Sequence, residues 1–170
     1  MGTESEKSAQ LIPEGAIRLP DLTIGGKTPQ ELEEALISGG FGVSGETRGM
    51  LRRHDFTTLS DQQTLSLVRV KVSDLGLTDD PTTEQIYAKA NALGLGLCPA
   101  EVGPYLRLAY KDKPLDEVLF VGMKPIIASD GHQGVFRLDR GGDGSWLRRN
   151  WAAPDNQWLP SDWIVFSLSK

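Results

Sequence analysis

The loop at residues 129–134 holds the side chains best suited to chemistry in this 170-residue chain. Asp130 and His132 stand two positions apart, and a carboxylate beside an imidazole can act as an acid–base pair or supply half of a metal site. We therefore consider a catalytic pair of Asp130 and His132, with Glu101 as a further carboxylate. The glycines at 131 and 134 also suit an ordinary hairpin connection with His132 solvated at its tip. Both interpretations stay open from the residues alone.

The second candidate site is the tryptophan-rich C-terminal end. All four tryptophans lie within the last 25 residues. Trp151 and Trp158 flank a turn and are expected to be partly exposed, with Asp155 and Arg149 close to them in sequence. Aromatic rings beside amides and acids bind sugars, peptides or cationic groups. The alternative is that large rings fill the core of a small β-rich region, as we expect for Trp163, which precedes an apolar run.

Two other patterns are incomplete. Cys98 is the only cysteine, and a cysteine nucleophile needs a base such as His54 or His132; its apolar neighbours and the following proline favour a buried, inert thiol. Residues 139–150 have acids at the first and fifth positions of a calcium loop, but a glycine at the third and an asparagine where glutamate is required. A β-turn is the expected structure there, and we predict no metal site.

Composition narrows the class of protein. The apolar fraction is 39%, the charged fraction is 24% and the net charge is −5, which fits a soluble globular chain and argues against a nucleic-acid partner. A single cysteine excludes an internal disulfide. No segment has the length and apolarity of a membrane span or a secretory signal, so we expect a cytoplasmic protein. No motif implies a cofactor.

The domain organisation is expected to be simple. Residues 1–12 are predicted to form a flexible N-terminal tail. Residues 13–170 are predicted to form one α+β domain, with a possible sub-boundary near 111–115, where an exposed turn is expected.

Two short helices are predicted near the N-terminus. Thr28 and Glu31 form a capping box around a proline at the first helical position, and the glycines at 39–40 end the helix. Ser44 is the expected cap of the second helix. Helices joined this closely raise a helix-turn-helix reader of DNA as a third hypothesis, and the second helix and its end supply three basic residues: Arg48, Arg52 and Arg53.

The rest of the chain is mainly predicted as strands. Valines alternate with basic residues over 64–72, which indicates one half-buried strand. A helix is expected from about 80 to 93, and residues 105–110 suit either a helix or a strand. Further strands are predicted at 118–121, 126–127, 135–138, 146–147 and 163–168.

Three segments carry a resemblance. The sequences LCPAEVGP at 97–104, MKPI at 123–126 and SDG at 129–131 are similar to a pattern in a group of uncharacterised bacterial proteins. The resemblance extends from Thr28 to the C-terminus and implies a single co-inherited unit. No activity is known for that group, so it assigns no role to these residues.

These observations predict an α+β protein in which N-terminal helices pack on a mixed, mainly antiparallel sheet, with a β-rich C-terminal half. Because no catalytic constellation is complete and the tryptophans cluster, the leading hypothesis is a non-enzymatic binding or interaction module. Its expected ligand is a peptide, a glycan or a partner protein, bound by Trp151, Trp158, Asp155 and Arg149. The alternative is a hydrolase-like enzyme that uses Asp130 and His132.

Overall fold

The computed structural model describes residues 12–77, 79–110, 118–128 and 130–168. The predicted tail at 1–12 lies outside the described residues except for Ile12, and the sub-boundary near 111–115 lies outside them entirely. The helices are α2 (Pro29–Ser38), α3 (Gly45–Leu51), α4 (Thr83–Ala92), α5 (Val102–Ala109) and the short 3₁₀ turn η1 (Val72–Leu75).

Helices and one large mixed sheet make up the fold, so the predicted α+β class is confirmed. The sheet runs β1-β5-β11-β7-β9-β10-β3, with β6 beside β11 and β8 beside β9. Its pairs are antiparallel except β11–β7 and β10–β3. A separate pair joins β2 to β4. The strands are β1 (Ile17–Arg18), β2 (Leu22–Ile24), β3 (Gly42–Val43), β4 (Gln63–Leu65), β5 (Leu67–Lys71), β6 (Leu95–Gly96), β7 (Val118–Val121), β8 (Ile126–Ile127), β9 (Gln133–Gly141), β10 (Gly144–Trp151) and β11 (Trp163–Leu168).

The helix starts follow from local side-chain chemistry. Thr28 accepts from the Glu31 backbone, and the Glu31 carboxylate accepts from the Thr28 N–H at 2.9 Å. Thr82 and Gln85 repeat this capping box at α4, and Ser44 caps α3. Each bond satisfies a backbone donor that the first turn leaves unpaired. The predicted starts of α2 and α3 and the helix at about 80–93 are therefore confirmed.

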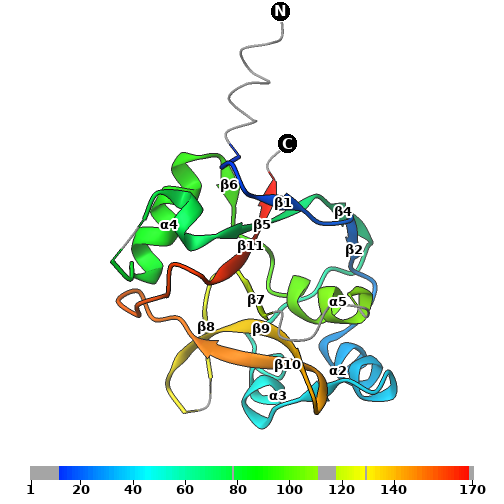
Figure 1. The fold of residues 1–170 in the computed structure, drawn as a ribbon. Coiled ribbons are helices and arrows are strands. Elements are labelled where there is room, and N and C mark those ends of the chain that lie inside the picture. Colours follow the sequence, from blue (N-terminus) through cyan, green and yellow to red (C-terminus); the bar gives the residue numbers. More distant parts are fainter. Residues whose placement is uncertain (1–11, 78, 111–117, 129, 169–170) are drawn as a thin grey trace, which may run out of the picture.

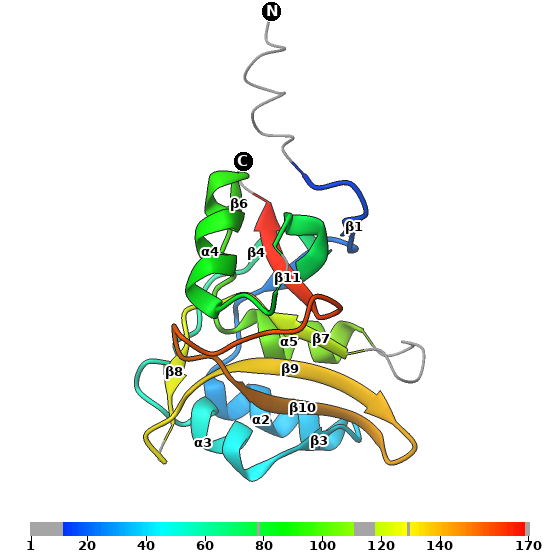
Figure 2. The same cartoon turned by 60° about the vertical axis from the view of Figure 1, so that its left-hand side comes forward.

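The helices cover different parts of the sheet. Figures 1 and 2 show α2 and α3 beside the β9–β10 hairpin, with α4 at the opposite end of the molecule. Helix α5 packs against both β9 and β10. Gly103 of α5 makes this approach possible, because a Cβ there would lie 2.6 Å from a ring carbon of the fully buried Phe136. The hydrophobic core continues from this contact through the sheet to β11 and α4, since Phe136, Phe166 and Ile86 belong to one buried cluster.

One predicted strand changes in the structure, one undecided segment is resolved and one predicted turn is confirmed. The expected strand at 64–72 is divided into β4 and β5, because β4 pairs with β2 in the small sheet while β5 lies between β1 and β11. Val72, the last residue of the predicted strand, begins η1.

The undecided segment 105–110 is the C-terminal part of α5 and its cap. The calcium-like segment is the β9–β10 hairpin, which turns at Gly142-Asp143, so the β-turn is confirmed.

The expectation that Trp158 is partly exposed is wrong. It is 4% exposed, its Nε1–H donates to Thr83 Oγ1 at 2.7 Å, and its ring meets Phe120 edge-on at 5.0 Å. Burial is favourable here because both the polar and the apolar part of the indole have a partner. Trp163, expected in the core, lies at its margin, with the guanidinium of Arg69 4.7 Å from its ring centre.

Candidate functional site

Four predicted site residues meet where β10 ends, although the sequence placed them in two separate sites. The Asp130 carboxylate accepts from Arg149 Nη1 through both oxygens, at 2.9 and 2.8 Å. The His132 ring stacks on Trp151 with 4.6 Å between ring centres and 20° between planes. We call Asp130, His132, Arg149 and Trp151 the β10-end cluster.

The register of the β9–β10 hairpin brings the cluster together. Counting outward from the turn places Gly134 opposite Trp151 and Phe136 opposite Arg149. A Cβ on Gly134 would lie 2.5 Å from Arg149 Cγ, so the Arg149 side chain crosses the strand over this glycine. That route leaves Arg149 only 8% exposed and leads its guanidinium to the loop that holds Asp130.

Within the cluster, the Asp130 carboxylate is an ion-pair partner of Arg149. Asp130 accepts from the His132 backbone N–H at 3.0 Å, and no hydrogen bond joins its carboxylate to the imidazole within the described residues. The His132 N–H and the Arg149 guanidinium lower the pKa of Asp130 below its ordinary value, which keeps the carboxyl ionised. A general acid needs the opposite shift.

A groove of about 580 Å³ runs beside the cluster. Trp151 and Leu159 border it and are 53% and 58% exposed, whereas Asp155 is exposed elsewhere and does not line it. The groove is lined by Val118, Phe120, Arg137, Arg149, Asn150, Trp151, Asn156, Gln157, Trp158, Leu159 and Asp162.

The amide side chains of the groove each donate one hydrogen bond to a backbone carbonyl. Asn150 Nδ2 and Asn156 Nδ2 both donate to the Trp151 carbonyl at 3.1 Å, and Gln157 Nε2 donates to Asp80 O at 3.2 Å. Because an amide nitrogen carries two hydrogens, each of these groups keeps a second N–H as well as its oxygen for a ligand. Burial raises the pKa of Asp162, whose Oδ2 accepts from Leu159 N at 3.0 Å. The groove therefore offers both hydrogen-bond acceptors and donors to a ligand.

A second, more enclosed cavity of about 370 Å³ lies where two of the motif segments meet. The bridge between Cys98 and Met123 holds the segments 97–104 and 123–126 side by side. We call this the Glu101 cavity, after the 2% exposed carboxyl in its lining. It is lined by Asp55, Thr57, Thr58, Leu59, Gln63, Cys98, Pro99, Ala100, Glu101, Lys124, Pro125 and Ile126.

Cys98 does not have the environment of a nucleophile. Its side chain is 4% exposed, and Sγ donates to the Val165 carbonyl at 3.6 Å. Burial raises its pKa to about 12, so the thiol stays protonated at neutral pH. Neither His54 nor His132 lines the cavity. The structural interpretation of Cys98 agrees with this geometry.

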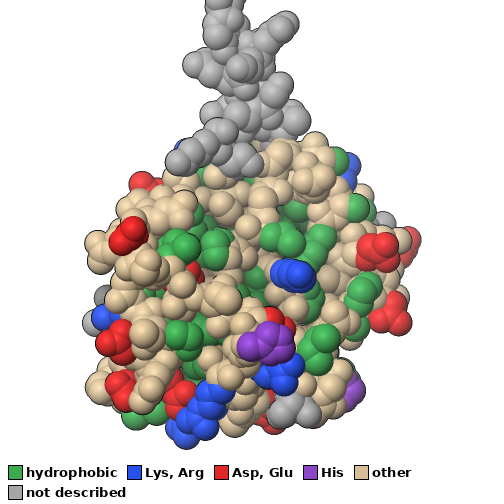
Figure 3. Space-filling view, turned by 180° about the vertical axis from the view of Figure 1, so that it is seen from behind, with side chains coloured by type: hydrophobic (Ala, Val, Ile, Leu, Met, Phe, Trp, Pro, Cys, Tyr) green, Lys and Arg blue, Asp and Glu red, His purple; other side chains and the backbone are tan. Residues whose placement is uncertain are grey.

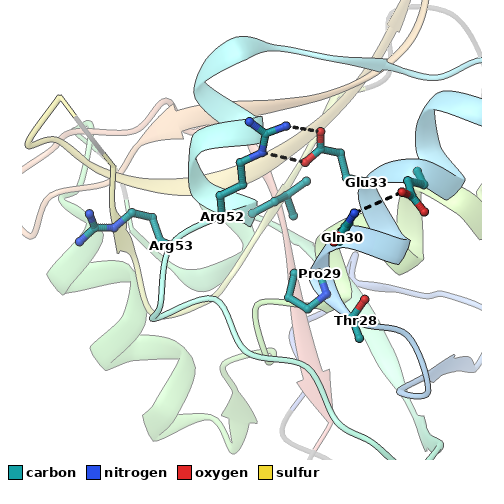
Figure 4. Close-up of a pocket in the computed structure, with 8 residues that line it drawn as sticks. Thr28, Pro29, Gln30, Glu33, Arg52 and Arg53 are labelled. Atoms are coloured by element: carbon teal, nitrogen blue, oxygen red, sulfur yellow. Dashed lines mark hydrogen bonds and ion pairs between the residues drawn. The ribbon is translucent and has the colours of Figure 1, made fainter.

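Two of the three arginines at α3, Arg52 and Arg53, are paired with acids. A cleft of about 780 Å³ separates the first turns of α2 from the end of α3. Figure 4 shows Arg52 crossing it to Glu33, with hydrogen bonds of 3.2 and 2.8 Å. Arg53 lies 3.7 Å from Asp55. In Figure 3 the basic side chains on the visible face are likewise interspersed with acidic and apolar ones. A DNA-binding surface needs a continuous basic face, and none of these observations favours one.

The described ranges contain no group of three or more His, Cys, Asp and Glu side chains placed to hold a metal ion, and none of their helices is long and apolar enough to cross a membrane. Comparisons with protein-family models, with curated proteins and with solved structures found no match.

The position of the β9–β10 hairpin turn in the sequence indicates that the cluster residues meet, although composition does not. A two-residue hairpin turn at Gly142-Asp143 fixes which residues face each other across β9 and β10. Counting from it pairs Gly134 with Trp151, and hence brings the loop with His132 next to the indole. The burial of Glu101 had no such local signal, because its neighbours come from distant segments.

Proposed function

We propose that this protein is a non-enzymatic binding module and that its ligand lies in the groove beside Trp151. The observation that carries the proposal is the exposed indole of Trp151, held in one orientation by the stacked His132 ring. Arg149 and Asp130 fix the adjacent loop through a two-oxygen ion pair. An aromatic side chain ordered before binding loses little conformational entropy when a ligand arrives.

The chemistry of the groove favours a neutral glycan segment. A sugar ring offers a C–H face that packs on an indole, and hydroxyl groups that donate to amide and carboxylate oxygens. Trp151 supplies the ring, while Asn150, Asn156 and Asp162 supply acceptors along the groove. Arg137, about a third exposed, supplies donors to ligand oxygens. Apolar Leu159 and Val118 add contact area on the same surface.

The test is calorimetric titration of the full chain with neutral oligosaccharide probes: cellohexaose, maltohexaose and chitohexaose. We expect one of them to bind and Trp151→Ala to weaken that binding about 10- to 100-fold, equivalent to about 1–3 kcal/mol for a stacking contact. Trp146→Ala is the matched control, because Trp146 is on the same strand but outside the groove. Its affinity is expected to be unchanged.

Two results would contradict the glycan proposal. One is the absence of binding to all three probes together with Trp151-dependent binding to a random peptide library, which assigns the groove to a peptide. The other is equal loss of glycan binding in both tryptophan variants. The hydrolase-like alternative predicts that His132→Ala abolishes an activity and leaves binding intact, whereas the binding proposal predicts weaker binding, because the support of the indole is removed.

A further inference from the structure

The groove beside Trp151 continues into a second depression. This depression has a volume of about 540 Å³, and Val118 and Arg137 line both it and the groove. A ligand that extends along the groove past Arg137 therefore enters the depression. The depression is lined by Val118, Arg137, Asp139, Arg140, Gly141, Asp143 and Arg148.

The hairpin register places two arginines of this surface opposite each other. Arg137 on β9 faces Arg148 on β10, and like charges in directly opposed positions destabilise a strand pair. Asp139, 13% exposed, lies between them: Arg148 Nε donates to its Oδ2 at 3.0 Å, and Arg137 Nε lies 3.1 Å from the same oxygen. Asp143 is 65% exposed and 3.7 Å from Arg148 Nη2, so its pairing is weak. The two guanidiniums therefore share one closely placed carboxylate.

The outer end of Arg137 is oriented and accessible. Its side chain is 35% exposed, and only Nε among its nitrogens is buried without a hydrogen bond. Nη1 and Nη2 are open to solvent and donate no hydrogen bond within the described residues. Asp162, on the groove side, accepts from the Leu59-independent backbone N–H of Leu159 and makes no ion pair with Arg137 in that part of the chain. The Phe120 ring lies 5.8 Å from the guanidinium carbon and supports its position.

These donors fit a planar anion. Nη1 and Nη2 of one guanidinium donate in parallel to the two oxygens of a carboxylate, and such charge-assisted pairs are about twice as strong as neutral hydrogen bonds. We propose that the glycan bound in the groove is acidic, and that Arg137, with Arg148 beside it, binds a carboxylate on a sugar unit beyond the one on Trp151. This inference rests on the proposed glycan groove and names the chemical class of its ligand. The bound carboxylate also offsets the repulsion between the two opposed arginines.

The experiment compares matched neutral and acidic hexaoses on the full chain by calorimetric titration. Cellohexaose, maltohexaose and chitohexaose are each paired with their C6-oxidised forms, in which the CH₂OH groups are carboxylates. We expect the acidic form of the glycan that binds to bind about tenfold more tightly than the neutral form. Hexaglutamate offers a similar series of carboxylates without sugar rings and is expected to bind more weakly. Equal affinity for hexaglutamate would assign the arginines to an acidic peptide and overturn the proposal.

Three variants test the role of the guanidinium. Arg137→Gln is expected to abolish the tenfold gain of the acidic hexaose and to change the affinity for the neutral one much less. Arg137→Lys keeps the charge without the two parallel donors, so it should recover only part of the gain. Arg52→Gln is the matched control, because it removes the same charge from a different cleft; its gain should be unchanged. Equal losses in Arg137→Gln and Arg52→Gln would overturn the proposal.

A salt series on the unaltered protein covers the case in which Arg137→Gln does not fold. The Debye length falls from about 30 Å at about 0.01 M salt to about 3 Å at about 1 M. We expect the gain of the acidic hexaose to shrink over this range while the neutral affinity stays constant. A gain that is independent of salt would reject an ionic contact.

The outcomes separate this inference from the proposed function. Neutral binding that depends on Trp151, with no gain for the acidic form, would overturn the acidic assignment and leave the groove as a glycan site. Binding of an acidic hexaose that Trp151→Ala does not weaken would show that the groove is not part of the site, and both proposals would then fail.

Discussion

The β10-end cluster and the Glu101 cavity hold carboxyls in opposite circumstances. Asp130 is exposed, and the Arg149 guanidinium meets both of its oxygens. Glu101 is 2% exposed, and one of its oxygens has no partner in the described chain. The two pKa values also shift in opposite directions. Hydrogen bonds lower the pKa of Asp130, and burial raises the pKa of Glu101.

The difference separates two ways in which the fold places a carboxyl. At the cluster the chain satisfies its own charges and leaves an apolar ring exposed, so a ligand gains contact area and few ionic bonds. At the cavity the carboxyl is buried beside apolar groups, and one of its oxygens has no hydrogen-bond partner in the described chain. The two regions therefore differ in how far the fold satisfies a carboxyl.

The largest expected effect comes from the tryptophan that packs beneath the groove. Trp158→Ala removes a buried ring and leaves Thr83 Oγ1 without its indole donor, so we expect the free energy of unfolding to fall by about 3–5 kcal/mol. Trp151→Ala is the control and should change it by about 0.5 kcal/mol or less, as for an exposed side chain. Urea denaturation measures both. Similar losses for the two variants would remove the distinction between the packing ring and the binding ring.

A smaller effect is expected at the glycine over which Arg149 passes. Gly134→Ala places a methyl 2.5 Å from Arg149 Cγ, so the arginine must move away from Asp130, at a cost of about 1–3 kcal/mol. Gly142→Ala is the matched control, because a Cβ there meets nothing within 4 Å. Denaturation gives the stability, and NMR of the Arg149 side chain reports the ion pair. An intact pair in Gly134→Ala would contradict the assigned route.

The smallest expected effect is the pH dependence of stability, in which the carboxyls of Glu101 and Asp130 act with opposite sign. Below pH 4.5 the carboxyl of Glu101 is protonated in both the folded and the unfolded protein. As the pH rises from 4.5 through the raised pKa of the folded state, the unfolded protein ionises more readily than the folded one. The free energy of unfolding therefore falls over this range. For Asp130 the sign reverses: its contribution is present above pH 3.8 and is lost as the pH falls through its lowered folded pKa.

Denaturation at a series of pH values should therefore separate two variants. Above pH 4.5, Glu101→Gln should become more stable relative to the parent protein. Asp130→Asn should be less stable than the parent above pH 3.8, and this difference should disappear as the pH falls below 3.8. Parallel pH profiles for the two variants would show that the two carboxyls do not differ as the structure indicates.

Local features of the fold were predictable because their causes are local. The capping boxes at Thr28 and Thr82 each lie within four consecutive residues, and the hairpin turn at Gly142-Asp143 needs two residues between strands. The division of the predicted strand at Ser66 was not foreseen, because apolar and polar residues continue to alternate from Leu65 to Leu67. Only the pairing of β4 with β2 and of β5 with β1 and β11 requires the division.

The candidate site was predictable in its members and not in its arrangement. Asp130, His132, Arg149 and Trp151 were all identified by residue type, yet as a catalytic pair and a separate aromatic site. Their 19-residue separations close only through the hairpin register. Trp158 was placed on the surface because nothing in its neighbours along the chain indicates Thr83 and Phe120 as partners.

The sequence by itself determined the helix starts, the hairpin turn and the supply of chemically capable side chains, because these depend on neighbours a few residues away. Only the tertiary structure decided which of those side chains are buried, paired or exposed. Burial and ion pairing depend on contacts between distant segments, as when residues 57–63, 97–104 and 123–126 enclose Glu101. For that reason Asp130, the prominent acid of the sequence, is a satisfied ion-pair partner, and Glu101 is the acid that remains incomplete.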